Sequence, residues 1–440
     1  MNIHSNHRPG PSAGEAGTPA RAPAAAGCTC RVCGSPVSET MVDLGVTPLC
    51  ESFLAAADVD AMEPFYPLHA MVCGDCFLVQ LKEYVSPDHI FTEYAYFSSF
   101  STSWVAHAKA YVEMITRRMS LCSGSLAVEL ASNDGYLLQH FAPLGVPALG
   151  VEPAPNVAAA AKARGVDSVV DFFGRRLARQ LLAEGRAADL VIGNNVLAQV
   201  PDLDDFVGGI AILLKPEGLV TLEFPHLVRL IEGNQFDTIY HEHFSYFSLH
   251  TIERMAALHG LRVVDVEELP THGGSLRVYL AHAGSHHARA ERVSGLAAAE
   301  ERFGIRDLAI YRAFGEQVRR TKRNLLSLLI RLKNEGKSIV GYGAPGKGNT
   351  LLNYCGVGPD FLDFTVDRNP YKHHRFTPGT RIPILPVEAI EEVRPDYVLI
   401  LPWNLEAEIV AQMRHIGAWG GRFIVPIPDA YVIDPKELRP

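Results

Sequence analysis

The stretch LAVELASNDGYLLQHF, residues 126–141, decides the fold expected for this chain. It reads as a short apolar strand that ends near Glu129, a turn from Ala131 to Gly135 and the start of a helix. A second apolar run, PALGVEP, follows it and ends on Glu152. An acidic side chain at the end of the second strand of an α/β sheet can accept hydrogen bonds from both hydroxyls of a ribose. The stretch therefore predicts a Rossmann-like domain with a nucleoside pocket.

The turn favours S-adenosylmethionine over a dinucleotide. It has one glycine and three small polar residues, whereas the G-x-G-x-x-G turn lets the backbone approach a pyrophosphate closely. S-adenosylmethionine has no phosphate, and an Asn/Asp turn can hold its amino-acid end. The alternative is a Rossmann-like domain whose pocket is empty or holds another ligand. The candidate cofactor residues are Glu129, Ala131, Asn133, Asp134, Gly135, Glu152 and, at the end of a third strand in ADLVIGNN, Asn194 and Asn195.

Apolar runs and helical patterns divide the rest of the chain. Two segments alternate short strands with helices, which is typical of open α/β sheets. Between them, apolar residues from Tyr311 to Leu332 recur at spacings of about three, four and seven, which predicts a long helix. The expected divisions are a disordered lead-in (1–26), a cysteine-bearing domain (27–85), a linking helical segment (86–118), a first Rossmann-like domain (119–289), a linker helix (290–336) and a second Rossmann-like domain (337–440).

Two C-x2-C pairs, CRVCG and CGDCF, stand out among the eight cysteines. Each short loop can present two thiolates to one point, so Cys30, Cys33, Cys73 and Cys76 can close a tetrahedral Zn²⁺ site. The alternatives are free structural cysteines, or a register in which Cys28 replaces one of the first pair; the glycine after Cys33 favours Cys30 with Cys33. A site with four thiolates has no open position, so the zinc is expected to be structural.

A second unusual stretch is IYHEHFSYFS, residues 239–248. Three interpretations are open for this stretch: a metal site, a proton-transfer site, or a polar strand end without function. Alternate residues of an extended segment share a face, so His241 and His243 would point one way and Tyr240 and Glu242 the other. In a loop, all four could converge. The H-x-H pattern supplies two metal ligands, and the nearby sequence offers no clear third.

Proton transfer suits these residue types. Removing a proton from a carbon next to a ketone requires a base with a pKa near neutral, a group that orients the base and a donor to the enolate oxygen. Histidine, glutamate and tyrosine match those three roles in kind. The resulting carbon nucleophile could then accept a methyl group from a sulfonium.

The C-terminal segment contains a true G-x-G-x-x-G, formed by Gly341, Gly343 and Gly346, and Asp367 ends the next strand. This is a dinucleotide-binding fingerprint, so NAD(P) is a rival ligand. Lys347 departs from the usual fingerprint and, with the cations of VDRNPYKHHRFTPGTR, makes a local basic face. A helix N-terminus with cations nearby would equally receive the diphosphate of a nucleotide substrate. The alternative is a solvated loop with incidental charge.

Composition limits the possible partners. The net charge is -9, and a nucleic-acid-binding protein would normally show a strongly basic face. No apolar run reaches the ~20 residues of a membrane span, and the N-terminus lacks the apolar stretch of a secretory signal. We expect a cytoplasmic chain with a small-molecule partner, no nucleic acid and no membrane, which is a monomer or a weak homodimer.

Together, the motifs resemble those of the three-domain, S-adenosylmethionine-dependent sugar-nucleotide C-methyltransferases of deoxysugar and antibiotic biosynthesis. The resemblance covers nearly the whole chain from Cys30 and rests on CRVCG…CGDC, YAYFSSFS, VELASNDGYLL, YHEHFSYFS, HGGSLRVY, GYGAPGKGNTLLNYCG and VDRNPYKHHRFTPG. It implies an N-terminal zinc-binding domain, a central class I methyltransferase domain and a C-terminal Rossmann-like domain. It also implies a dTDP-linked 4-keto-6-deoxysugar as substrate, methylated on the carbon next to the ketone.

The resemblance also implies roles for single residues. His243 is similar to the family's base, and Tyr240 and Glu242 are similar to its active-site partners. A tyrosine of YAYFSS, either Tyr94 or Tyr96, is similar to a further residue of that site.

One position departs from the family pattern. Related chains commonly carry a histidine where NVLAQV has Gln199. Glutamine can hydrogen-bond to a sugar ketone or hydroxyl but cannot shuttle a proton at neutral pH, so the sugar and the methylated carbon stay open. Alternatives to the methyltransferase are an NAD(P)-dependent sugar-nucleotide oxidoreductase and a non-catalytic, zinc-bearing nucleotide-binding protein. The residues expected around the nucleotide sugar are Gly343, Lys347, Asn349, Arg368, Lys372 and His272.

Overall fold

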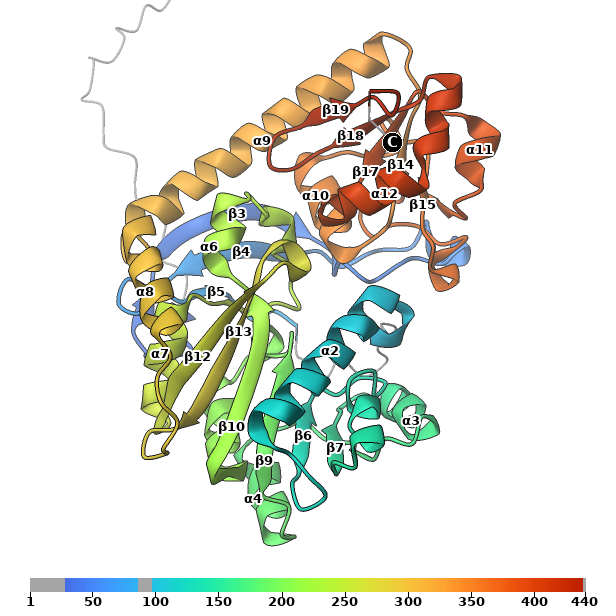
Figure 1. Ribbon diagram of the computed structural model, residues 1–440. Coiled ribbons are helices and arrows are strands. Elements are labelled where there is room, and N and C mark those ends of the chain that lie inside the picture. Colours follow the sequence, from blue (N-terminus) through green and yellow to red (C-terminus); the bar gives the residue numbers. More distant parts are fainter. Residues whose placement is uncertain (1–27, 86–96, 438–440) are drawn as a thin grey trace, which may run out of the picture.

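The computed structural model describes residues 28–85 and 97–437. The central α/β domain has a sheet with the strand order β12-β13-β10-β9-β6-β7-β8 (Figure 1). Strands β10, β9, β6, β7 and β8 are parallel, and β13 runs antiparallel between β10 and β12. This is the class I methyltransferase fold that we expected. The strands are β6 (Ala127–Leu130), β7 (Ala148–Val151), β8 (Ser168–Val169), β9 (Ala188–Asn194), β10 (Leu214–Pro225), β12 (Leu261–Leu269) and β13 (Ser275–His282).

Helix α2 (Thr102–Met119) lies in the segment that we expected to be a link, but it packs on the central sheet. The Ser101 hydroxyl caps it by accepting a hydrogen bond from the Trp104 amide. Tyr111 and Ile115 share an apolar cluster with residues of the strands, so α2 is part of the central domain. The other helices of this domain are α3 (Pro155–Ala163), α4 (Arg175–Ala183), α5 (Leu203–Leu213), α6 (Leu227–Glu232) and α7 (Leu249–Leu258).

The N-terminal domain is built on an antiparallel sheet with the order β11-β5-β4-β3. Strand β11 (Ser245–Tyr246) comes from the IYHEHFSYFS stretch and pairs Ser245 with Gln80 and Tyr246 with Val79. The candidate catalytic stretch therefore completes the sheet of the cysteine-bearing domain. The strands before it in the chain are β1 (Cys28–Thr29), β2 (Pro36–Val37), β3 (Glu39–Thr47), β4 (Tyr66–Val72) and β5 (Val79–Leu81).

The C-terminal domain is a second Rossmann-like unit. Its sheet has the order β16-β15-β14-β17-β18-β19, parallel except for β19. The central strand β14 leads through the glycine-rich loop into helix α10, as the sequence predicted. The elements are β14 (Ile339–Tyr342), α10 (Gly346–Cys355), β15 (Thr365–Val366), β16 (Ile384–Leu385), α11 (Ala389–Val393), β17 (Tyr397–Ile400), α12 (Glu406–Gln412), β18 (Arg422–Val425) and β19 (Tyr431–Ile433).

Two helices occupy the region in which we expected one long helix. α8 (Glu291–Phe303) ends at Gly304, whose φ is 89°, and α9 (Leu308–Asn334) begins after the cap residue Asp307. Although α9 is long, no helix in the described ranges is apolar enough to cross a membrane. The side chains predicted for its buried face are all buried: Tyr311, Phe314, Val318, Leu325, Leu329 and Leu332.

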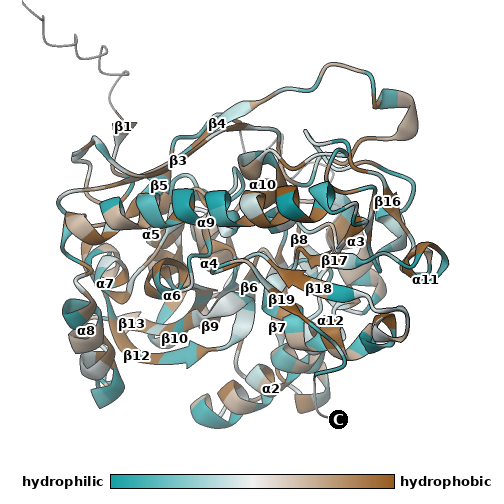
Figure 2. Cartoon of the chain, turned by 90° about the horizontal axis from the view of Figure 1, so that it is seen from above, coloured by the Kyte–Doolittle hydropathy of each residue, from teal (hydrophilic) through white to brown (hydrophobic). Residues whose placement is uncertain are grey.

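Helix α9 runs from α8 to the C-terminal domain and packs against β3 of the N-terminal sheet (Figure 1). A Cβ on Gly315 would lie 2.8 Å from Met41 O, so this glycine lets α9 lie directly against β3. Figure 2 shows hydrophilic and hydrophobic residues alternating along the helix. One apolar cluster contains Met41 of β3, Phe236 of the central chain segment, Phe314 of α9 and Leu399 of β17, so the three parts of the chain share a core.

Candidate active site

The turn after β6 has the strained backbone that its sequence suggests. Ala131, Asn133 and Gly135 have φ values of 54°, 50° and 77°. A Cβ on Gly135 would lie 2.9 Å from Val166 Cγ2, so a larger residue would not fit without a shift. The turn lies at the carboxyl end of the parallel strands, which is where open α/β sheets bind ligands. Strained residues of this kind cluster at functional sites.

Glu152 ends β7 and holds this turn. Its Oε2 accepts a hydrogen bond from Asn133 N and its Oε1 accepts one from Ala154 N, each at 2.9 Å. Each oxygen keeps a second lone pair, so Glu152 can still accept hydrogen bonds from ribose hydroxyls. Beside it, burial raises the pKa of Glu129 well above its ordinary value, and the charge of Glu152 adds to the rise. Burial therefore favours the protonated form of Glu129, which can donate a hydrogen bond.

Asp134, expected to bind the cofactor, is engaged within the protein. Its Oδ2 lies 2.8 Å from Arg164 Nη1 and also accepts a hydrogen bond from the Ser99 hydroxyl. The Ser98 amide donates to Asn133 Oδ1 at 2.9 Å. Both serines belong to the YAYFSSFS motif, so the second half of that motif covers the turn.

Asn194 ends β9 at the same edge of the sheet, and Asn195 follows it directly. The Asn195 amide Nδ2 lies 3.1 Å from His272 Nε2, and because an amide nitrogen only donates, the imidazole accepts. Burial, together with the charge of Lys347, lowers the pKa of His272 to about 4, which keeps the ring neutral. The His272 ring also packs edge-on against Trp104, with 5.2 Å between the centroids. His272 thus connects the cofactor edge to the HGGSLRVY motif.

Glu223, near the end of β10, anchors a buried charge network that the sequence did not reveal. Its Oε2 lies 2.7 Å from Arg277 Nη2, its Oε1 lies 3.0 Å from His107 Nε2, and the Thr271 hydroxyl donates to it at 3.1 Å. Burial would raise the pKa of Glu223, but the hydrogen bond from His107 and the charge of Arg277 hold it below its ordinary value. The network ties α2 and the loop after β12 to the end of β10.

IYHEHFSYFS contains a turn where we considered an extended segment. His243 N donates to Tyr240 O at 2.9 Å, and the rings of these residues lie 4.1 Å apart between centroids. The segment is therefore a loop at this point, which was the second of the two conformations considered, and the pairing of faces expected for an extended segment does not apply. His241 Nε2 lies 3.2 Å from Pro67 O, on the side of the N-terminal domain. Neither histidine belongs to a metal-ligand group in the part of the chain that the structure describes.

His243 is held as a neutral base. Its Nδ1 lies 3.2 Å from Thr238 O, and because a carbonyl only accepts, Nδ1 carries the proton and Nε2 keeps a free lone pair. Burial is the main cause that lowers the pKa of His243 to about 3, and the charge of Lys347 contributes; a proton on His272 would also oppose one on His243. His243 therefore lies within electrostatic reach of His272, which contacts the cofactor edge.

Glu242 is buried and adjoins the N-terminal domain. Burial raises its pKa to about 8, and the negative charge of Glu51 adds to the rise, while Lys372 opposes it. At neutral pH this side chain is protonated. It can therefore act as a hydrogen-bond donor.

Lys347, at the start of α10, reaches the same junction from the C-terminal domain. Its Nζ donates to Asn404 Oδ1 at 2.9 Å and lies 5.3 Å from the centroid of the Trp403 ring. Trp403 Nε1 donates to Asp237 Oδ2 at 2.7 Å. Burial raises the pKa of Asp237 to about 6 and lowers the pKa of Lys347. The sequence did not predict that Asn404, Trp403 and Asp237 belong to this site, because they form no local motif.

The N-terminus of α10 is occupied by the protein itself. The Gly346 amide bonds to the carboxylate of Glu51, whose Oε1 would lie 2.9 Å from a Cβ on Gly346. Lys372 Nζ lies 3.5 Å from Glu51 Oε2 and donates to Ala344 O. Asp367, the expected ribose ligand of a dinucleotide, accepts a hydrogen bond from Ala344 N at 2.8 Å. An internal carboxylate at this helix N-terminus argues against a diphosphate bound there, whether it belongs to NAD(P) or to a nucleotide sugar.

Three residues expected near the nucleotide sugar have other contacts. Asn349 is 1% exposed and donates to Cys50 O at 2.6 Å. Gly343, with a φ of 86°, allows the glycine-rich loop to pack closely on a neighbouring loop. Arg368 Nη1 lies 3.5 Å from Glu408 Oε1 at the surface. The contacts of the other three expected residues have been described above; these residues are Lys347, Lys372 and His272.

Gln199 lies in the short 3-10 helix η5 (Leu197–Gln199), which contacts β11. This position is next to the strand that follows His243. The other candidate catalytic residues, Tyr94 and Tyr96, lie outside the described residues.

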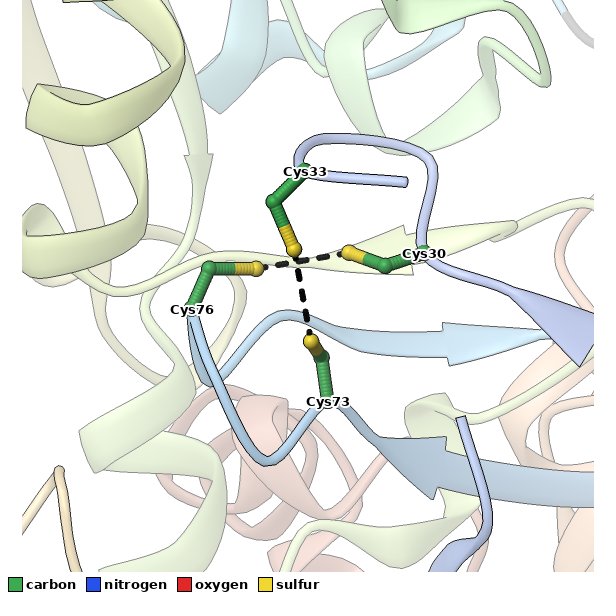
Figure 3. A group of neighbouring side chains, drawn as sticks. All are labelled: Cys30, Cys33, Cys73 and Cys76. Carbon is green, nitrogen blue, oxygen red and sulfur yellow. Dashed lines mark hydrogen bonds between the residues drawn. The ribbon is translucent and has the colours of Figure 1, made fainter. Parts of the chain in front are cut away.

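The predicted metal-binding cysteines converge on one point (Figure 3). They sit in two similar loops, in which Gly34 N donates to Cys30 O at 2.9 Å and Phe77 N donates to Cys73 O at 3.0 Å. Cys28, the rival ligand, lies outside the cluster. Four thiolates at this spacing suit a zinc ion about 2.3 Å from each sulfur. Their Sγ atoms lie within 4.8 Å of one another: Cys30, Cys33, Cys73 and Cys76.

Three family models together match most of the chain. The family model "Putative zinc binding domain" matches residues 30–91, "Methyltransferase domain" matches residues 106–266, and "C-methyltransferase C-terminal domain" matches residues 270–428. C-methyltransferase NovU from Streptomyces niveus is 38% identical over 408 residues, which are 93% of this chain and 97% of that protein.

More distant likenesses cover less than half of the chain. Ubiquinone biosynthesis O-methyltransferase from Rhodopseudomonas palustris (strain HaA2) is 26% identical over 110 residues, which are 25% of this chain and 44% of that protein. Among solved structures, the PH0226 protein from Pyrococcus horikoshii OT3 is 16% identical, with a TM-score of 0.35, over 44% of this chain and 97% of that one. That structural likeness is too weak to carry an argument. From the full-length match to NovU and the three domain matches, the chain belongs to the family of S-adenosylmethionine-dependent C-methyltransferases that carry an N-terminal zinc-binding domain.

Proposed function

We propose that this enzyme methylates a dTDP-linked 4-keto-6-deoxysugar on the carbon next to the ketone, after that carbon has lost a proton. The observation that carries the proposal is the pair Tyr240–His243. The hydrogen bond to Thr238 O fixes the Nδ1 proton of His243 and leaves Nε2 free to act as a base. The sugar-nucleotide motifs of the sequence give the proposal its substrate class.

In this mechanism, Nε2 of His243 takes the proton and the ketone oxygen becomes an enolate oxygen. A pKa of about 3 makes His243 a weak base in the free enzyme. The developing negative charge of the substrate raises that pKa, because an opposite charge nearby favours the imidazolium. The cation of Lys347 and the neutral acid of Glu242 are the groups that we assign to stabilising the substrate's negative charge. S-adenosylmethionine supplies an electrophilic methyl group on a sulfonium.

The test is to incubate the enzyme with S-adenosylmethionine and a panel of dTDP-keto-sugars in deuterated water. We expect the product to gain one methylene unit by mass spectrometry, and the carbon-bound proton to exchange with solvent when the methyl donor is left out. The variant His243→Gln should lower exchange and methyl transfer about 10²–10⁴-fold and leave the affinity for S-adenosylmethionine unchanged.

His241→Gln is the matched control, because it replaces a histidine of the same turn that faces Pro67 instead. It should keep most of the exchange activity. Full proton exchange in His243→Gln would show that another group is the base. Equilibrium dialysis with NAD and with S-adenosylmethionine distinguishes a methyltransferase from an oxidoreductase. The proposed function requires that the enzyme binds S-adenosylmethionine and does not bind NAD.

A further inference from the structure

The first cysteine loop contacts the residue that follows the candidate base. Arg31 lies between Cys30 and Cys33, and its Nη1 donates to Leu81 O at 2.6 Å and to Phe244 O at 3.1 Å. Its guanidinium carbon lies 5.6 Å from the centroid of the Phe244 ring. The Phe244 carbonyl also accepts a hydrogen bond from the Leu81 amide at 3.0 Å. One peptide group next to His243 is thus held from two sides by the N-terminal domain.

The second cysteine loop holds the same stretch further along. The Thr251 hydroxyl donates to Cys76 O at 3.3 Å, and Arg254 Nη1 donates to Asp75 O. Both donors lie on helix α7, which follows β11. The backbone on the C-terminal side of His243 is therefore fastened to both loops of the zinc site.

We propose that the zinc site positions the catalytic histidine, and that Arg31 is the positioning residue that couples the two. With zinc bound, the four thiolates fix the loop that carries Arg31, and Arg31 then fixes the Phe244 carbonyl. A charged donor makes a strong hydrogen bond to a carbonyl, and this one is partly shielded from water. The catalytic part of this inference rests on the proposed function, whereas the structural coupling does not.

The coupling matters because a base acts over a short range. A displacement of about 1 Å in a reacting group can cost about 10²-fold in rate. The hydrogen bond to Thr238 O orients the ring of His243 through Nδ1. The main-chain position of His243 depends on the residues on either side of it. On the C-terminal side, those neighbours are β11 and the Phe244 carbonyl.

The first readout needs no substrate. Amide hydrogen exchange, followed by mass spectrometry, is compared in the zinc-loaded wild type and in Arg31→Met, which keeps the apolar stem but loses the donors. We expect exchange in residues 79–81 and 244–247 to be at least about tenfold faster in the variant, with zinc content unchanged. Arg31→Lys, which retains one charged donor, should fall between the two.

The matched control is Arg312→Met. Arg312 also bonds to the N-terminal domain, through Glu39, but it is exposed and remote from β11 in sequence. This variant should leave exchange in residues 244–247 as in the wild type. Equal exchange in wild type and Arg31→Met, with zinc bound in both, would overturn the coupling.

The second readout is steady-state methyl transfer. A base that is merely displaced lowers kcat and leaves KM and the affinity for S-adenosylmethionine near the wild-type values. We expect Arg31→Met to lower kcat about tenfold or more, with partial recovery in Arg31→Lys. A full kcat in Arg31→Met, despite faster amide exchange, would overturn the positioning role. If no keto-sugar is methylated by the wild type, the proposed function fails, and the amide-exchange result still decides whether the coupling exists.

Discussion

Replacing Glu223 by glutamine should destabilise the central domain far more than its conservative chemistry suggests. The change keeps the shape of the side chain but removes the charge that neutralises Arg277, which is 4% exposed. Breaking a buried ion pair from one side costs about 3–5 kcal/mol, because a charge is left buried without its partner. Arg277 keeps its contact with Glu267, so we expect the lower end, about 3 kcal/mol.

Scanning calorimetry provides the measurement. For a domain of this size, each kcal/mol lost from the free energy of unfolding lowers Tm by about 2–4 °C. The Tm of Glu223→Gln should therefore be about 6–12 °C below that of the wild type. Glu268→Gln is the matched control, since Glu268 pairs with Arg229 at 2.9 Å but both side chains are about half exposed. Exposed pairs contribute about 0–1 kcal/mol, so this control should hardly move the transition.

The pH dependence checks the cause. The pKa of Glu223 is lower in the folded protein, so its ionised form stabilises the fold above the unfolded pKa of about 4.3. That contribution is lost as the pH falls through the folded pKa. The Tm difference between wild type and Glu223→Gln should therefore be largest above about pH 5 and shrink in more acidic solution. A difference below about 2 °C at pH 7, or one that grows on acidification, would refute the reasoning.

Two further outcomes follow from the site. Gly135→Ala should raise the Kd for S-adenosylmethionine at least about tenfold in isothermal titration, because the new Cβ would meet Val166 and a left-handed alanine is strained by about 1–2 kcal/mol; an unchanged Kd would contradict the assignment of this turn. Glu242 has a raised pKa, so the stability it gives is present below its unfolded pKa of about 4.3 and is lost as the pH rises through about 8. The Tm of the wild type should therefore fall between about pH 5 and pH 8 more than the Tm of Glu242→Gln, and equal slopes would show that the fold does not hold Glu242 protonated.

Local patterns in the sequence predicted much of the fold. The cofactor turn, the two cysteine loops and the glycine-rich loop each place chemically distinct residues a few positions apart, so their backbone follows from short-range rules. Residues 131–135 adopt the turn expected of them, and Cys30, Cys33, Cys73 and Cys76 form the expected cluster. The apolar spacing of α9 predicted its buried face, although the break at Gly304 was not foreseen.

What the sequence could not reveal are partnerships between distant segments. The glycine-rich loop suggested a diphosphate site, and nothing local indicates that Glu51 would fill it from nearly 300 residues away. The same holds for Trp403 with Asp237 and for Glu223 with His107. In IYHEHFSYFS, the alternating residue pattern is compatible with one extended strand, but only Ser245 and Tyr246 form a strand. The residues before them form a turn, and this difference depends on pairing with the distant N-terminal sheet.

The apolar cluster shared by β3, α9 and β17 bears on how the polypeptide is made. While a ribosome is still synthesising the chain, Met41 and its neighbours wait for Phe314 and Leu399, which emerge hundreds of residues later. Until then, those side chains face water or a chaperone. A nascent chain that is truncated before α9 would expose this apolar surface. The solubility of the N-terminal part of the chain therefore depends on the synthesis of α9 and the C-terminal domain.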